Sequence, residues 1–539
     1  MSAARSSLVM AAGTVLSRIL GFVRAVMLAA MIGVTTNAAD AFGVANQLPN
    51  NVYAIIVGGV LNAVLVPQIV RARKHEDGGK GYIDRLVTLA IVVFSVVTVA
   101  ATVAAPLLVR LYTTNWGAEQ LALATAFAYW CLPQLFFYGL YSMLGEVLNA
   151  RSAFGPFMWA PVLNNVVSIA GMGLFIWLFG LDPTGTRPIS AWGFDQITLL
   201  AGTATLGVAA QALILFASWK RIGLRFKLNF KWRGFGLRPA LKAATWTLAM
   251  VLVTQIGGLV QTSVASRVAA ERDGSLSIPG IAASSIAWLI FMLPHSVATV
   301  SIATARFTDL ARHAHDHNWD EFKAGLVSAL KAIAFIAAFA TAGLLVLAYP
   351  VSRVFVGEYP ATAALGNVLA AFVVGLLPFS FVYMLQRAYF ALEDTRTPFL
   401  FTTAQIALHI TGSLTLAVTT PVEHLVERLA YLTSFTVLVQ AILAWMLLRR
   451  RIGSLRVAGA TGSGFARSGI AGSTATYALV AAVSGGIGWL VLQWFGGNSA
   501  GAFAVASVGS SLVTCSVVGL VMAAVYLGLL KVIRGIPSL

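Results

Sequence analysis

The feature that most constrains this chain is a succession of apolar segments, each long enough to cross a lipid bilayer. A membrane-spanning helix needs about 20 mostly apolar residues. Fourteen such segments are expected near 6–33, 39–71, 82–112, 119–149, 157–180, 193–219, 240–268, 280–311, 321–350, 361–391, 398–419, 425–449, 469–495 and 502–533. Only 10% of the residues are charged, whereas a soluble domain carries about a quarter. The chain is therefore predicted to be an all-α integral membrane protein.

The net charge of +17 follows the pattern of membrane topology and does not indicate nucleic-acid binding. A nucleic-acid binder gathers its basic residues on one folded surface. Here they concentrate in alternate loops, namely Arg71, Arg73, Lys74, Lys80 and Arg85; Lys220, Arg221, Arg225, Lys227, Lys231, Arg233, Arg238 and Lys242; Arg306, Arg312 and Lys323; and Arg449, Arg450, Arg451 and Arg456. The loop with Arg267 and Arg272 is the main exception. Basic loops stay in the cytoplasm, so an even number of helices places both termini there.

Signs of an enzyme, a metal site or a bound cofactor are missing. Cys131 and Cys515 both lie in apolar segments, which provides neither a disulfide framework nor a zinc-binding spacing. His313, His315 and His317 could suggest a metal, but no second cluster completes a coordination sphere. No Walker or HExxH pattern occurs in the sequence. We expect a transporter with no metal, cofactor or catalytic site, and we interpret the histidines as a solvated loop.

Proline positions indicate an internal duplication. Leu48-Pro49 recurs as Leu293-Pro294 and Leu132-Pro133 as Leu377-Pro378, and each second copy lies 245 residues after the first. Two equal offsets predict two six-helix lobes with a helix pair appended. The expected organisation is an N-lobe at 1–220, a basic cytoplasmic loop at 221–239, a C-lobe at 240–450, a cytoplasmic loop at 451–468 and the final helices at 469–539. Because six is even, the lobes should be parallel repeats.

The same prolines predict matched bends at Pro49, Pro133, Pro294 and Pro378. Proline inside a helix removes one backbone hydrogen bond and kinks the rod. Proline is also commoner in membrane helices than in soluble ones. The symmetric placement favours bends that serve a rocking motion.

Two arginines inside the first segment are the strongest candidates for a functional site. A charge at the bilayer centre costs about 3 kcal/mol unless it faces protein or water. Arg18 and Arg24 lie six residues apart, about 120° around a regular helix. They could line a broad cavity, and the alternative is that they snorkel to the membrane surface. Snorkelling is plausible for one and strained for both.

The remaining ionisable residues have simpler interpretations. Asp40 opens the second segment, where a helix start favours an acid. Glu146, Glu393 and Asp394 are expected near helix ends as interface anchors. For His295 and His409 we expect hydrogen bonds between helices in preference to a proton relay.

Several motifs resemble the MurJ/MviN family of lipid II flippases. The matching residues are Ser17-Arg18-Ile19-Leu20-Gly21-Phe22-Val23-Arg24, Ala39-Asp40-Ala41-Phe42, Ala45-Asn46-Gln47-Leu48-Pro49-Asn50, Val66-Pro67, Ala160-Pro161-Val162-Leu163-Asn164 and Asp394-Thr395-Arg396-Thr397-Pro398. The resemblance implies two lobes around a cationic cavity that carries an undecaprenyl-diphosphate-linked peptidoglycan precursor across the bacterial inner membrane by alternating access. It also implies that the last two helices form an apolar groove for the polyprenyl tail.

By the same resemblance, Arg18 and Arg24 would contact the diphosphate, because arginine offers bidentate, permanently charged phosphate recognition. Ser17, Asp40 and Asn50 complete the expected substrate-binding set. The implied partners are lipid II, membrane lipids and cell-wall synthesis proteins, and no nucleic acid. Some relatives carry a cytoplasmic domain after the last helix, which this chain, ending at Leu539, is expected to lack or to have lost.

The chain also departs from the family pattern. Arginines that many members have are absent from Asn51-Val52-Tyr53-Ala54 and from Trp288-Leu289-Ile290, and the acid after the second arginine is replaced by Ala25. Sodium-site acids have no obvious match in helices 7, 11 and 12. The cavity should therefore be less cationic than in those members. The rival functions are export of another polyprenyl-diphosphate oligosaccharide, cation-coupled multidrug export, and a non-transporting scaffold.

Overall fold

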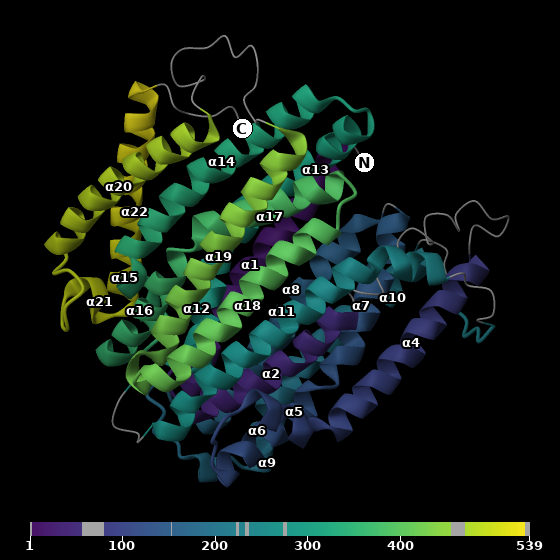
Figure 1. Cartoon of the computed structure of the whole chain (residues 1–539). Helices are drawn as coiled ribbons and strands as arrows, with labels where there is room; N and C mark the ends of the chain where they lie inside the picture. Colours follow the sequence, from purple (N-terminus) through teal and green to yellow (C-terminus); the bar gives the residue numbers. More distant parts are fainter. Residues whose placement is uncertain are drawn as a thin grey trace. The chain divides into compact units, whose positions relative to one another are not determined.

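The computed structural model describes residues 3–56, 80–151, 153–221, 226–231, 237–272, 277–453 and 469–533. The chain divides into two compact units, Met1–Ala270 and Glu271–Leu539. Helices dominate both, and the described residues contain no β-strand. This confirms the predicted all-α class (Figure 1).

The first unit is built from long helices joined by short turns. Its elements are α1 (Ala3–Ile32), α2 (Asn37–Ile56), α4 (Lys80–Val103), α5 (Ala105–Tyr112), α6 (Ala118–Cys131), α7 (Gln134–Ala150), α8 (Phe154–Phe179), α9 (Phe194–Ile197), α10 (Thr203–Arg221) and α11 (Leu237–Glu271). The turn from α1 to α2 depends on Gly33, whose φ of 74° favours glycine. Thr36 follows it and caps α2, because its Oγ1 accepts from the Ala39 backbone N–H at 3.0 Å.

The second unit has the same helical character. Its elements are α12 (Ile281–Pro294), α13 (Val300–His315), α14 (Trp319–Val346), α15 (Ala348–Arg353), α16 (Tyr359–Val373), α17 (Leu376–Ala391), α18 (Arg396–Thr419), α19 (Val422–Ile452), α20 (Ile470–Trp494), α21 (Phe503–Ala506) and α22 (Val508–Val532). A π-helical turn, η4 (His295–Thr299), joins α12 to α13.

The number of membrane-spanning helices agrees with the prediction of about fourteen. Among the described residues, twelve helices are long and apolar enough to cross a membrane, and the bent pair α16 and α17 adds a thirteenth. The predicted segment 39–71 is not among these helices. Its residues 57–71, including Val66-Pro67, lie outside the described residues, as do 222–225, 232–236 and 454–468 of the predicted cytoplasmic loops.

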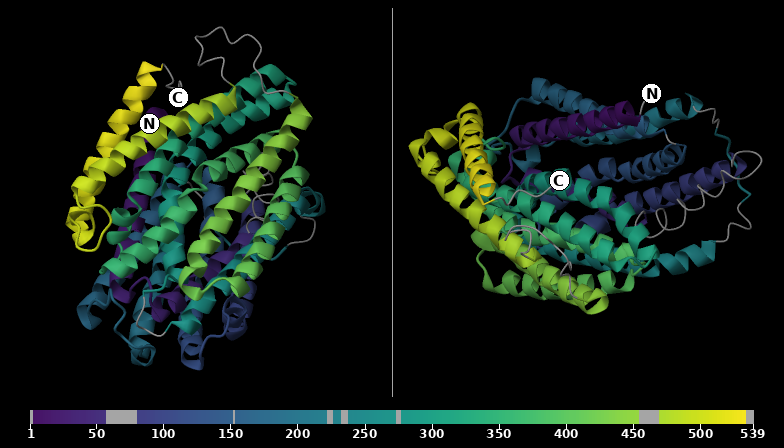
Figure 2. Two further views of the ribbon diagram at one scale, coloured as in Figure 1. Left: turned by 60° about the vertical axis from the view of Figure 1, so that its left-hand side comes forward. Right: turned by 90° about the horizontal axis from the view of Figure 1, so that it is seen from above.

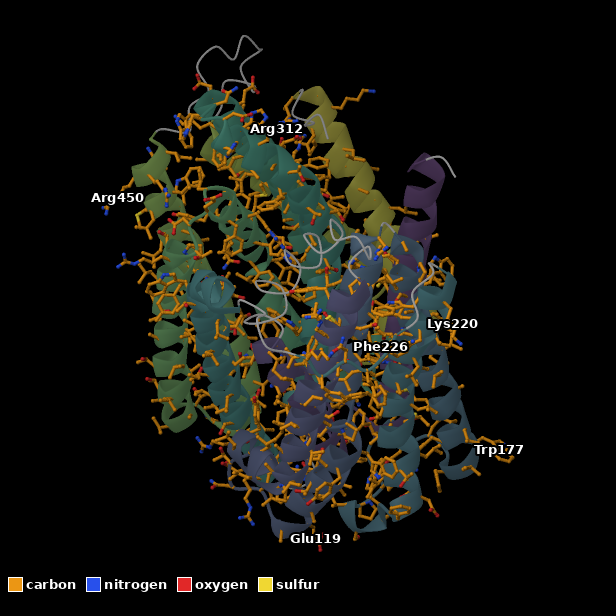
Figure 3. The ribbon with its side chains drawn as sticks, turned by 90° about the vertical axis from the view of Figure 1, so that its right-hand side faces the viewer. Glu119, Trp177, Lys220, Phe226, Arg312 and Arg450 are labelled. Atoms are coloured by element: carbon orange, nitrogen blue, oxygen red, sulfur yellow. The ribbon has the colours of Figure 1, made fainter. Side chains whose placement is uncertain are left out.

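The outer surface of the helices is apolar, as a lipid environment requires. Trp177 on α8 is 79% exposed and Trp494 on α20 is 90% exposed. Figure 3 shows the Trp177 side chain directed away from the helices of the first unit. In water such rings would be buried, so their exposure identifies these faces as lipid-facing.

The four prolines lie at different kinds of site. Pro49 is inside the continuous helix α2, and Pro133 lies in the break between α6 and α7. Pro294 directly precedes the π-helical turn η4. Pro378 is in the first turn of α17, just after a break where α16 and α17 are bent by 43°. Whether these sites move during function stays a prediction.

The break before α17 is stabilised by a neighbouring helix. Ser434 on α19 donates its hydroxyl to the Ala371 carbonyl at 2.7 Å and lies 3.1 Å from that of Phe372. These are carbonyls that a continuous helix would have satisfied itself. Gly375 permits the approach, since an added Cβ would lie 2.9 Å from the Ser434 Cα.

Helix α11 packs within the first unit, although the predicted C-lobe begins at residue 240. The Ser266 hydroxyl accepts from the Thr114 backbone N–H at 2.7 Å, and its carbonyl accepts from the Trp116 indole at 2.8 Å. Nearer the start of α11, the Gln255 amide donates to the Asn51 carbonyl at 3.0 Å. The compact unit thus extends one helix beyond the predicted repeat, whose boundaries remain a prediction from sequence.

The final helix pair belongs to the second unit. Helices α20 and α22 run alongside each other, and α20 packs on α14 (Figure 2). Tyr526 of α22 donates its hydroxyl to the Phe335 carbonyl of α14 at 2.8 Å. The Phe335 ring lies 5.8 Å from that of Tyr477 on α20. Aromatic residues therefore hold the pair against α14.

Candidate functional site: a polar cluster in the first unit

Helix α1 is held against α8 by close packing and by one asparagine. Gly13 allows the approach, because a Cβ there would meet the Trp159 indole at 2.8 Å. The Asn165 amide of α8 donates to the Ser17 carbonyl at 2.8 Å and lies 3.3 Å from its hydroxyl. Ser17, one of the predicted substrate contacts, is therefore engaged with α8.

Arg24 lies two turns further along α1 and is partly buried. It interacts electrostatically with Tyr138 of α7. The Tyr138 hydroxyl in turn donates to the Gln134 carboxamide oxygen at 3.1 Å. The arginine thus interacts electrostatically with a tyrosine that is itself hydrogen-bonded to Gln134, and Gln134 makes further polar contacts.

Gln134 connects three helices. Its side-chain amide donates to Asn46 Oδ1 of α2 at 3.3 Å and to Thr205 Oγ1 of α10 at 3.1 Å. Thr205 itself donates to the Trp130 carbonyl at 2.6 Å, beside the break that precedes Pro133. We call Arg24, Asn46, Gln134, Tyr138 and Thr205 the polar cluster.

The polar cluster is costly in a membrane unless its groups satisfy one another. Gln134 is only 1% exposed, and it uses both its amide N–H groups and its carbonyl oxygen. An arrangement so fully bonded is rigid. It therefore places a fixed set of polar groups inside an apolar bundle, where Tyr138 interacts electrostatically with Arg24.

The other predicted site residues occupy different surroundings. Arg18 is partly buried on α1, about 120° around the helix from Arg24. Asp40 is fully buried in the first turn of α2, where the helix dipole favours an acid. Asn50 is exposed one turn beyond Asn46 on the same face of α2.

Charges and motifs in the sequence reveal only part of this site. Gln134, Tyr138 and Thr205 are uncharged and lie in apolar segments. Their only signal is polarity within a lipid-spanning helix, strengthened for Gln134 by its position directly after Pro133. Asn46 lies in the motif Ala45-Asn46-Gln47-Leu48-Pro49-Asn50, but nothing in the sequence distinguishes it from its neighbours.

The histidine predictions can be checked in the second unit. His295 is 2% exposed, and its Nδ1 lies 3.1 Å from the Ser380 hydroxyl of α17. This confirms the predicted hydrogen bond between helices. Within the described part of the chain, no group of three or more histidine, cysteine, aspartate or glutamate residues could hold a metal ion.

Comparison with known families gives a match over most of the chain. The model of the family described as "Lipid II flippase MurJ" matches residues 28–509. The match includes Asp40 and Asn50, and it begins after Arg24. A "Probable lipid II flippase MurJ" from Rhizobium meliloti (strain 1021) is 27% identical over 433 residues, which cover 77% of this chain and 76% of the relative.

A further relative and two solved structures agree. A "Probable lipid II flippase MurJ" from Haemophilus influenzae is 28% identical over 419 residues, which cover 71% of this chain and 75% of the relative. The structure "Lipid II flippase MurJ, inward closed conformation" covers 96% of this chain and 98% of its own, with 19% identity and a TM-score of 0.70. An inward-facing multidrug transporter of the MATE family covers 82% of this chain and 100% of its own, with 18% identity and a TM-score of 0.61. Both structures show the fold alone.

Proposed function

Because the chain belongs to the MurJ family of lipid II flippases, we propose that it moves lipid II from the inner to the outer leaflet of the bacterial inner membrane by alternating access. The observation that carries this proposal is the intramembrane Arg24 within the polar cluster. A diphosphate cannot enter hydrocarbon without a partner of opposite charge. A guanidinium provides one that stays charged and binds phosphate oxygens in pairs.

Each site residue then has a role. Arg24 and Arg18 contact the diphosphate, while Ser17, Asp40 and Asn50 contribute further contacts or hold the helices that line the path. Gln134 and Tyr138 act as positioning residues, because they fix the surroundings of Arg24 and carry no charge themselves. The pair α20 and α22 provides the apolar surface for the polyprenyl tail.

Orientation and partners belong to the same proposal. Both termini face the cytoplasm, so that lipid II is collected on the side where the basic loops lie. Cell-wall synthesis proteins that use lipid II on the opposite face are the natural partners. The MATE likeness supports a shared transporter fold, while the family match favours lipid II over drug cations as the substrate.

The decisive experiment is rescue of a flippase-depleted bacterium combined with measurement of lipid II on the outer leaflet. We expect Arg24→Ala and Arg18→Ala to abolish rescue at normal protein levels, since a lost charge-assisted contact lowers binding about tenfold or more. Arg110→Ala is the matched control, because Arg110 is exposed at the end of α5.

Full rescue by both variants would remove the arginines from the proposed site. Unchanged outer-leaflet lipid II after depletion of the wild-type protein would instead transfer the proposal to another polyprenyl-diphosphate oligosaccharide. The two results are separable because one compares variants and the other compares cells with and without the wild-type protein.

A further inference from the structure

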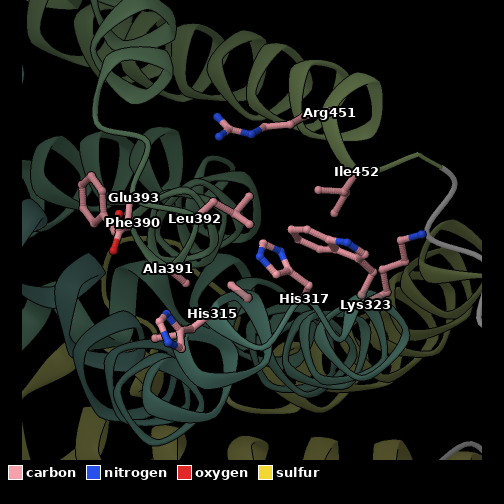
Figure 4. Close-up of a pocket in the computed structure, with 12 residues that line it drawn as sticks. His315, His317, Lys323, Phe390, Ala391, Leu392, Glu393, Arg451 and Ile452 are labelled. Atoms are coloured by element: carbon pink, nitrogen blue, oxygen red, sulfur yellow. The ribbon is translucent and has the colours of Figure 1, made fainter.

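A second site is suggested by a cavity at one end of the second unit, where α13, α14, α17 and α19 begin or end. Its volume is about 740 Å³, within the range of about 300–1,000 Å³ that is usual for small-molecule pockets. Figure 4 shows His317, Lys323 and Arg451 around this cavity, which we call the end pocket. None of its lining residues belongs to the polar cluster.

The lining of the end pocket is rich in hydrogen-bond donors. Lys323, Arg451, His315, His317 and the Trp319 indole can all donate. Glu393 is the one carboxylate among the lining residues. Most of the remaining lining is apolar. A lining of this kind favours a ligand with several acceptor oxygens at one end and an apolar or planar body.

Two helices end at the end pocket with an unusual choice of residue. His317 follows α13 with φ of 54°, and Glu393 follows α17 with φ of 55°. Each ending is a Schellman motif, in which glycine is the usual residue at this left-handed position. The bonds from the Asn318 N–H to the His313 carbonyl and from the Asp394 N–H to the Tyr389 carbonyl are both 2.9 Å.

A side chain in the left-handed region is strained, and such strain clusters at binding sites. Glycine at either position would relieve it without changing the helix ending. That two strained side chains line one cavity suggests that the side chains themselves are used. The ring of His317 also lies 5.9 Å from that of Trp319, which gives the pocket an aromatic wall.

The two cations of the end pocket differ in how they are held. Arg451 is ion-paired with Asp394, and Asp394 also accepts from the Thr397 backbone N–H at 2.9 Å. This fixes the guanidinium, whose remaining N–H groups can still donate. Lys323 makes no ion pair within the part of the chain that the structure describes. A fixed guanidinium and an unpaired ammonium are suited to a phosphate group.

We infer that the end pocket binds a phosphorylated small molecule whose remaining part is aromatic or apolar. Arg451 and Lys323 take the phosphate oxygens, and the rings of His317 and Trp319 contact the body. Such a ligand has two sources, a nucleotide from solution or the headgroup of an anionic phospholipid. The inference is independent of the transport proposal, because the end pocket shares no residue with the polar cluster.

The test uses the full chain in phosphatidylcholine nanodiscs, with ADP added to solution or phosphatidylglycerol added to the bilayer. Binding is measured by native mass spectrometry on the wild type, Lys323→Gln and His317→Gly. We expect one probe to bind, and each substitution to weaken it about tenfold, the loss of one charged or ring contact. Arg450→Gln is the control, since Arg450 is an exposed neighbour of Arg451.

The His317→Gly variant separates binding from folding. Glycine relieves the left-handed strain, so a purely structural role predicts a higher melting temperature and unchanged binding. A stable variant that no longer retains the probe supports the end pocket as a ligand site. ADP binding identifies a nucleotide, and phosphatidylglycerol binding identifies a lipid headgroup. Failure of both probes, or binding that neither variant alters, overturns the inference.

Discussion

Positions 245 residues apart, which the sequence predicts to be equivalent, hold hydrogen-bonded side chains in one unit and aromatic rings packed edge to face in the other. In the first unit, the Gln134 amide donates to Asn46 at 3.3 Å. The residues 245 positions later are Phe379 and Phe291, whose ring centroids lie 5.4 Å apart. The same pair of helical positions therefore carries a polar contact in one unit and an apolar one in the other.

Both units have a tyrosine at the corresponding position, Tyr138 and Tyr383, but the arginine that interacts with it comes from a different position in each unit. Tyr138 interacts with Arg24, which lies on a different helix. Its counterpart Tyr383 accepts from Arg387, one turn along the same helix, at 2.9 Å. A contact within one helix orients the arginine side chain on that helix only. A contact between two helices also constrains how the helices pack against each other. The difference is in line with the proposal that the anionic group of the substrate binds in the first unit.

The largest effect on stability and transport is expected when Gln134 is replaced by phenylalanine, the residue found 245 positions later in the second unit. Gln134→Phe removes two donors and one acceptor from the buried polar cluster and adds volume. We expect a loss of about 3 kcal/mol in unfolding free energy and no rescue of flippase-depleted cells. Chemical denaturation in detergent and the rescue assay measure the two effects.

Gln134→Leu separates the lost hydrogen bonds from the added volume. The side chain is similar in size, so only the unpaired groups remain, at a cost of about 1–3 kcal/mol. Rescue should still fail, because Tyr138 loses its fixed acceptor beside Arg24. Wild-type stability and rescue in this variant would show that the polar cluster has no special role.

An intermediate effect is expected in the aromatic cluster formed by Phe291, His295 and Phe379. Phe379→Leu loses ring contacts with Phe291 at 5.4 Å and with His295 at 4.6 Å. Such pairs contribute about 0.5–1.5 kcal/mol each, so unfolding should become easier while rescue persists. Phe435→Leu is the control, because Phe435 is 55% exposed on α19. Loss of rescue at normal stability would mean that this cluster also serves transport.

The smallest effect is expected for His295→Asn, which gives the second unit the residue found at position 50 of the first. A carboxamide can still bond to the Ser380 hydroxyl, which lies 3.1 Å from the histidine nitrogen. The unfolding free energy should change by less than about 1 kcal/mol, with rescue retained. Rescue that fails in this variant at normal protein levels would indicate that His295 carries a proton.

The sequence was informative where a single physical quantity decides the outcome. Apolar length alone determines whether a helix can span a bilayer, so the helix number and class could be predicted. The Gln134 contacts could not be predicted, because an uncharged side chain in an apolar segment does not reveal its partner. The sequence also did not reveal the end pocket, because His313, His315 and His317 were expected in a solvated loop. That expectation was wrong for His313 and His315, which form the last turn of α13. Tertiary packing brings Arg451 to two of these three histidines.

The packing of α11 has a consequence for the order in which the protein is made. Ser266 bonds to Thr114 and Trp116, about 150 residues earlier in the chain. A ribosome that has inserted only the first six helices has not yet supplied this partner. The first unit therefore completes its contacts only after α11 enters the membrane, and a translational pause before that point would leave the turn after α5 without these hydrogen bonds.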